Sequence, residues 1–136
     1  MKHLFMIVCT LLLLAACSGA APATQVNADD VVQQFQDAGL ELTNIQKPER
    51  GPESPLPNSY GENITFNYAE LGDAGGQIFT CDTRDNCDAV YAYFETLEGL
   101  ADSYLYRSEA GTVIAQLNSS LTPEQAERFA AVIEGL

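Results

Sequence analysis

The feature that most constrains this chain is an apolar run that extends from Leu4 to Ala16, thirteen residues without a charge. At 1.5 Å per residue such a run makes about 20 Å of helix, whereas the hydrocarbon core of a bilayer is about 30 Å thick. With Lys2 in front of it, the run has the positive n-region and short h-region of a secretory signal peptide. We therefore predict that residues 1–16 direct export and are then removed.

The leader ends in Leu14-Ala15-Ala16-Cys17, a pattern that resembles the lipobox of bacterial lipoproteins. The resemblance covers the leader alone and implies that Cys17 becomes the first residue of the mature chain, with a diacylglycerol on its thiol. Two or three acyl chains, at about 0.8 kcal/mol per buried CH₂, anchor a protein stably. The implied location is the cell envelope, outside the cytoplasm, and the outer membrane if the host is diderm. Ordinary secretion with cleavage at the small residues 18–20, or retention of the leader as an anchor, are the alternatives.

The mature chain is small and strongly acidic. Without residues 1–16 it has 120 residues, which suits one domain that buries roughly two thirds of its unfolded surface. Five Lys and Arg then stand against nineteen Asp and Glu, a net charge of −14. Nucleic-acid binding and adhesion to anionic lipid headgroups both need cationic surfaces, so we exclude them.

Residues 17–27 are small and polar and form a predicted lipidated tether, and residues 28–136 form a predicted single domain. Apolar residues at helical spacing predict one helix that Asn27 caps, and a last helix that follows the capping box Thr122-Pro123-Glu124-Gln125. The predicted helices cover residues 28–38, 87–97 and 123–134.

Alternating apolar residues predict five strands, over residues 40–46, 63–71, 77–81, 103–107 and 112–118. Turn residues at 72–76 and 108–111 join neighbouring strands into hairpins, so most of the pairing should be antiparallel. We expect an α+β fold of two layers, in which three helices pack on an about five-stranded, mainly antiparallel sheet, in the order α-β-β-β-α-β-β-α.

A proline-rich loop, residues 47–62, separates the first two predicted strands. Its four prolines remove backbone donors and favour extended conformations. Loops of this length are often functional or simply mobile. The loop is therefore either a surface crossing or a docking arm, in which Leu56 and Tyr60 would contact a partner.

Cys81 and Cys87 are the two cysteines of the predicted domain. The secretory leader places them in a compartment that permits disulfides, and their spacing is not the C-x-x-C of redox motifs. We predict a structural disulfide that closes a short loop, with two free thiols or a redox or metal role as alternatives. The intervening acidic residues do not have the spacing of a calcium loop, and helix capping by Asp85 or Asn86 is the favoured interpretation.

The chain has few of the residue combinations that enzymes use for catalysis. The one histidine, His3, lies in the leader, so the mature chain has no Ser-His or Cys-His pair and no histidine for zinc. The glycine-rich stretch 72–76 precedes a predicted strand, which is not the setting of a phosphate-binding loop. We predict no catalytic residue, no metal and no cofactor; a small hydrolase that uses two carboxylates is the remaining enzymatic alternative.

Tyr104 and Tyr106 lie on one face of a predicted strand. They either complete the core between sheet and helix or form an aromatic patch for a partner or glycan. Beyond the leader, Gly75-Gly76-Gln77-Ile78-Phe79, Tyr93 and the stretch 104–116 resemble small bacterial lipoproteins with no assigned activity.

From these features we expect a non-enzymatic, lipid-anchored envelope protein. It would contact the membrane through the lipid on Cys17 and bind another envelope protein at the membrane surface. A small-ligand or glycan-binding module is the alternative from a different class.

Overall fold

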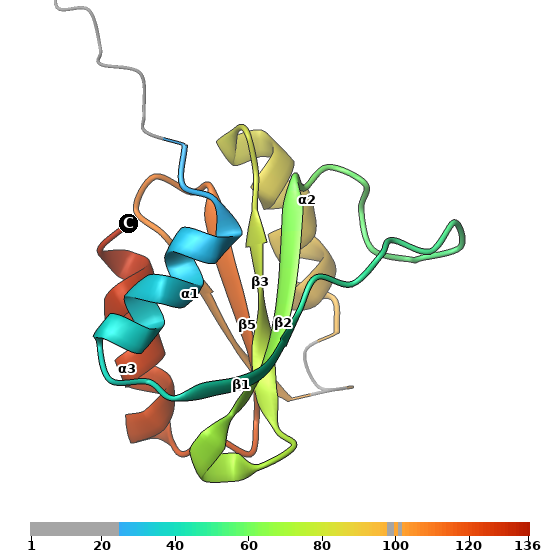
Figure 1. Ribbon diagram of the computed structural model, residues 1–136. Helices are drawn as coiled ribbons and strands as arrows, with labels where there is room; N and C mark the ends of the chain where they lie inside the picture. The colour runs from blue at the N-terminus through green and yellow to red at the C-terminus, as the bar shows by residue number, and fades with distance from the viewer. Residues whose placement is uncertain (1–24, 98–99, 101) are drawn as a thin grey trace, which may run out of the picture.

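The computed structural model describes residues 25–97, 100 and 102–136, so the predicted leader, Cys17 and most of the tether lie outside the described residues (Figure 1). The described chain forms a five-stranded sheet in which each neighbouring pair is antiparallel, with the strand order β1-β2-β3-β5-β4. The strands are β1 (Leu42–Gln46), β2 (Glu62–Tyr68), β3 (Gly75–Thr80), β4 (Ser103–Arg107) and β5 (Val113–Asn118). The helices are α1 (Ala28–Asp37), α2 (Arg84–Glu95) and α3 (Pro123–Glu134), with a single 3₁₀ turn, η1 (Ala69–Leu71).

This architecture confirms the predicted α+β class, the five antiparallel strands and the order of helices and strands. Local chemistry explains why two of the helices begin where the sequence indicates. The side chain of Asn27 accepts a hydrogen bond from the backbone N–H of Asp30 at 2.8 Å, and Thr122 and Gln125 form a complete capping box. Within the described residues, no helix is long and apolar enough to cross a membrane.

Helix α2 begins three residues before the predicted start. Its N-cap is Thr83, whose hydroxyl accepts from the backbone N–H of Asn86 at 3.3 Å. The expectation that Asp85 or Asn86 caps this helix is therefore wrong. A β-region residue with a short hydroxyl side chain fills the cap position, and Asp85 instead lies in the first turn, where a negative charge favours the helix dipole.

The helices cover both faces of the sheet, so the fold has three layers and the predicted two are wrong (Figure 1). Helices α1 and α3 lie side by side on one face, and α2 lies on the other. The physical reason is that β3 and β5 carry apolar side chains on both faces. Ile78 belongs to the core beneath α1 and α3, whereas the next residue, Phe79, belongs to the core beneath α2. A sheet that is apolar on both faces must be covered on both.

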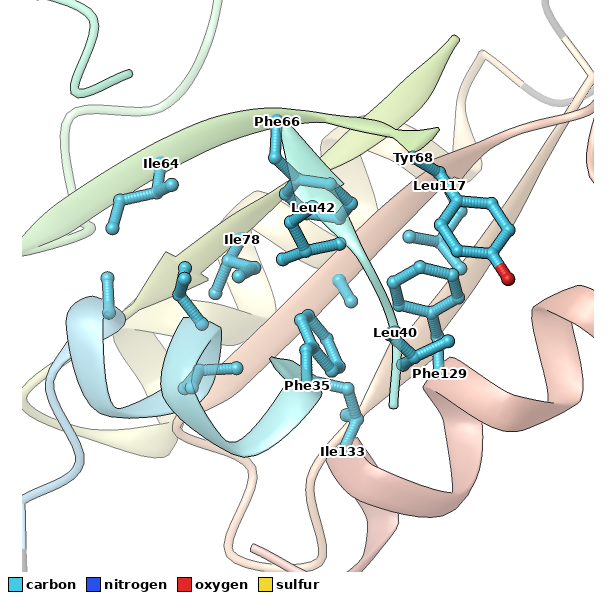
Figure 2. Close-up of a cluster of buried hydrophobic side chains, with 14 of the residues drawn as sticks. Phe35, Leu40, Leu42, Ile64, Phe66, Tyr68, Ile78, Leu117, Phe129 and Ile133 are labelled. Atoms are coloured by element: carbon cyan, nitrogen blue, oxygen red, sulfur yellow. The ribbon is translucent and has the colours of Figure 1, made fainter. Parts of the chain in front are cut away.

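The larger core lies between the sheet and the α1–α3 pair (Figure 2). Four buried aromatic rings meet there: Phe35 from α1, Phe66 and Tyr68 from β2, and Phe129 from α3. The centroid of Phe129 is 5.0 Å from that of Phe35 and 5.3 Å from that of Tyr68, both with the rings edge to face. Such pairs contribute about 0.5–1.5 kcal/mol beyond the burial of their area. This cluster fixes α3 against the sheet and so positions β4, the strand next to it.

Candidate functional site

The two edges of the sheet differ in how well they are protected against pairing with another chain. Strand β1 is one edge, and its pairing with β2 shifts register between Thr43 and Gln46. Asn44, inside that irregularity, has a φ of 48°, and a lysine and a proline follow the strand directly. Irregular pairing, lysine and proline are the devices by which natural sheets prevent edge-to-edge association.

Strand β4, at the other edge, carries none of these devices. All five of its residues pair with β5 in unbroken register, from Ser103 opposite Asn118 to Arg107 opposite Ile114. The sequence Ser-Tyr-Leu-Tyr-Arg has no proline, glycine or lysine, and aromatic residues favour strands. Among the strands of the described chain, β5 is the one with which β4 pairs.

The register shows which backbone groups of β4 lie on the side away from β5. The N–H of Ser108 donates to the carbonyl of Val113 at 3.0 Å, so this is a hydrogen-bonded pair of the ladder. Antiparallel pairs alternate, so Tyr106 and Tyr104 also bond to β5. The N–H and C=O groups of the intervening residues, Ser103, Leu105 and Arg107, therefore point away from β5.

The predicted contact residues Tyr104 and Tyr106 lie on the α3 face of this strand. Their rings stack with centroids 6.4 Å apart, and the hydroxyl of Tyr104 donates to the carbonyl of Leu121 at 3.1 Å. Both are half-buried against the larger core. Burial, followed by the negative charge of Glu127, raises the pKa of Tyr106 above the ordinary tyrosine value. These rings complete the core, which is one of the two roles the sequence allowed, and they stiffen β4 from one side.

The opposite face of β4 is held by α2. Leu105 packs against the smaller core, and Arg107 forms an ion pair with Asp88 of α2. The guanidinium of Arg107 also lies 4.8 Å from the centroid of the Tyr91 ring. The strand is thus fixed by side chains on both faces while its backbone edge faces outward.

The other two predicted contact residues lie on the opposite face of the sheet from Tyr104 and Tyr106. Leu56 and Tyr60 pack against the smaller core, on the α2 side of the sheet. The ring of Tyr60 lies edge to face with Phe79 at 5.0 Å, and the guanidinium of Arg50 lies 3.9 Å above it. The loop therefore folds back over its own domain with these two side chains inward, and it does not combine with Tyr104 and Tyr106 into one site.

Cys81 and Cys87 form the predicted pair. Their sulfur atoms are 2.11 Å apart and their Cα atoms 5.6 Å apart, as in a disulfide. Both residues are buried in the smaller core, where they join the end of β3 to the first turn of α2. In the part of the chain that the structure describes, no group of three or more His, Cys, Asp or Glu is placed to hold a metal ion.

The edge position of β4 is the feature of this candidate site that the sequence did not reveal. The sequence predicts the β4–β5 hairpin. However, β5 also pairs with β3, from which a helix and a strand separate it in the sequence, and this long-range pairing leaves β4 at the edge of the sheet. The available signal was the absence of proline and lysine from residues 103–107. Comparisons with protein-family models, with curated proteins and with solved structures find no match.

Proposed function

We propose that this chain is a lipid-anchored protein of the cell envelope, without enzymatic activity, that binds an extended segment of another envelope protein along β4. The observation that supports this function is the difference between the two edges of the sheet: β1 pairs irregularly, whereas β4 is regular and, among the described strands, pairs only with β5. An extended segment that adds a strand to an edge gains affinity from main-chain hydrogen bonds, which Ser103, Leu105 and Arg107 would supply here.

The anchoring half of the proposal is supported by the leader. The pattern Leu14-Ala15-Ala16-Cys17 resembles a lipobox, and ten residues, 18–27, separate Cys17 from the start of α1 at Ala28. A flexible stretch of that length spans about 15–20 Å on average. The domain would therefore work close to the membrane surface, where its partner is another envelope protein.

The charge of the domain favours one kind of segment. The negative charges of Glu127 and Glu134 act on Tyr106, and Asp102 precedes β4 directly. A partner segment with basic residues complements this surface, whereas a second copy of an acidic chain would be repelled. We therefore assign the edge to a heterologous, basic, extended segment.

Site-specific photocrosslinking in the native host tests the proposal. A photoreactive phenylalanine analogue replaces Ser103 at the β4 edge or, as a control, Gln33 on the exposed face of α1. We expect one partner to crosslink from position 103 and not from position 33, and Cys17→Ala to abolish the crosslink. Equal crosslinking from both positions, or none from position 103, would contradict the proposal.

A pair of substitutions at one position separates the backbone from the side chain. Leu105→Pro removes an N–H that points away from β5, and Leu105→Ala truncates the same side chain but keeps that N–H. We expect the crosslink to be lost in Leu105→Pro and kept in Leu105→Ala, with thermal unfolding used to show that both variants fold. Retention in the folded proline variant would exclude strand addition.

A further inference from the structure

A second surface lies on the α2 face of the sheet, beyond the end of the smaller core. Phe79 and Ile114 are buried beneath α2, but the next row of the register is Thr65, Gln77 and Gln116, which are half-exposed. We call this surface the amide face. Its members are uncharged polar residues of β2, β3 and β5: Asn63, Thr65, Asn67, Gln77, Gln116 and Asn118.

Hydrogen bonds fix three carboxamides of this face, those of Asn63, Gln77 and Gln116, across three strands. Nε2 of Gln77 donates to Oε1 of Gln116 at 2.9 Å. Nδ2 of Asn63 donates to the carbonyl of Ile78 at 3.0 Å and lies 3.5 Å from Oε1 of Gln77. Side chains held in this way lose little conformational freedom when a ligand binds, which favours affinity.

The amide face is hollowed at the end where β2 and β3 are joined. The hollow has a volume of about 310 Å³, near the lower end of the range for small-ligand sites. Asn67 pairs with Gly75, and the same register places Gly75 beside Asn118. In this row of the sheet, Gly75 lies between Asn67 and Asn118 and has no side chain, which leaves a gap between theirs. The turn residue Asp73 borders this gap.

The lining of the hollow restricts the chemistry of its ligand. It contains one carboxylate, Asp73, and no lysine or arginine, in a chain with a net charge of −13, so anionic ligands are disfavoured. Its polar side chains are mostly carboxamides, each of which both donates and accepts hydrogen bonds. The hydroxyl groups of a sugar also donate and accept, and an uncharged sugar has no charge to desolvate.

We infer that the hollow of the amide face binds a neutral oligosaccharide. Thr65, Asn67, Gln77, Gln116 and Asn118 would supply the hydrogen bonds. This binding uses side chains on the face of the sheet, whereas the proposed protein partner uses the backbone edge of β4. The saccharide site therefore does not depend on the proposed function.

The test is a titration of the full-length, ¹⁵N-labelled chain in a detergent without a sugar headgroup. The probes are maltotriose and chitotriose as neutral trisaccharides and trigalacturonic acid as an anionic one. We expect at least one of the neutral sugars to shift the amide resonances of residues 65–77 and 116–118. The anionic sugar should bind more weakly than that neutral sugar. Absence of shifts at tens of millimolar of both neutral sugars, or shifts confined to other residues, would overturn the inference.

Variants identify the contacting groups. Gln116→Ala and Asn118→Ala each remove a hydrogen-bonding side chain, and we expect each to weaken binding about five- to tenfold. Gln33→Ala, an exposed amide on α1, is the matched control and should leave affinity unchanged.

An uncharged extended peptide that shifts the same resonances at lower concentration than the sugars would overturn the saccharide assignment.

Discussion

Nη1 of Arg128, on α3, donates a hydrogen bond of 2.8 Å to the phenol oxygen of Tyr68, which lies sixty residues earlier on β2. The hydroxyl of Tyr68 in turn donates to Glu70 at 2.6 Å, and Nη2 of Arg128 donates to the carbonyl of Gly39 at 3.0 Å. One arginine thus ties α3 to the end of β2 and to the turn that follows α1. The ring of Tyr68 is fully buried, so this polar network closes one end of the larger core.

Tyr68→Phe should measure the value of this connection. The variant keeps the ring in its contact with Phe129 but removes the oxygen that joins Arg128 to Glu70. We expect a loss of about 1–2 kcal/mol in the free energy of unfolding, measured by urea denaturation. Tyr93→Phe, on α2, is the control and should change stability by less than about 0.5 kcal/mol. An equal loss of unfolding free energy in the two variants would show that the network does not contribute to stability.

Glu70 should make the stability of the fold depend on pH. Hydrogen bonds from Tyr68 and Gln125, together with the charge of Arg128, lower the pKa of Glu70 below its usual value. A carboxyl whose pKa is lower in the folded state stabilises the fold above its unfolded pKa, which is about 4.3, and this contribution is lost as the pH falls through the folded pKa. We therefore expect Glu70→Gln to lower the melting temperature at neutral pH and to have a smaller effect in acid.

The control for this experiment is Glu53→Gln, an exposed residue of the proline-rich loop. Its melting temperature should differ from that of the unmodified chain by a similar, small amount at both pH values. A Glu70→Gln effect that is independent of pH would show that the carboxylate charge is not what the network uses.

The local structure of this domain is largely predictable from its sequence, because local residues determine it. Asn27 and the Thr122–Gln125 box cap their helices as expected, and the turns at 72–76 and 108–111 join the predicted strands. The side on which α2 packs is not a local property. The signal for it was present in Ile78-Phe79, since a strand with apolar residues in succession is buried on both faces.

The candidate sites were less predictable, because both depend on long-range strand pairing. The pairing of β3 with β5 leaves β4 at the edge and also brings Gln77 next to Gln116, thirty-nine residues later. No local pattern specifies that contact. The residues that the sequence did single out, Leu56, Tyr60, Tyr104 and Tyr106, were chosen for apolar and aromatic character, and the fold uses them as partly buried core.

Gly75 is required by the close approach of β2. A Cβ atom at this position would lie 2.1 Å from the carbonyl oxygen of Phe66 and 2.6 Å from the Cα of Asn67, both of which are backbone atoms. We expect Gly75→Ala to destabilise the domain by at least about 2 kcal/mol, because one of the two strands must move. Gly51→Ala is the matched control, since nothing lies within 4 Å of its added Cβ. That variant should be neutral or more stable by up to about 1 kcal/mol, and comparable losses in both variants would contradict the steric explanation.

The disulfide should stabilise the fold by closing a short loop between β3 and α2. Cys81 and Cys87 are six residues apart, and the chain-entropy estimate for a loop of this size is about 2 kcal/mol. We expect the double variant Cys81→Ala, Cys87→Ala to lose roughly this amount in urea denaturation.

The control for the disulfide is the unmodified chain under reducing conditions, which keeps both buried sulfur atoms but breaks the bond. Reductant should lower the stability of the unmodified chain and leave the double variant unchanged, because only the former has a bond to lose between these positions. In the native, unreduced chain neither Cys81 nor Cys87 should react with an alkylating reagent, since both are bonded and buried. Alkylation of both without reductant would mean that the two thiols are free in the native protein and that packing alone holds α2 to the end of β3.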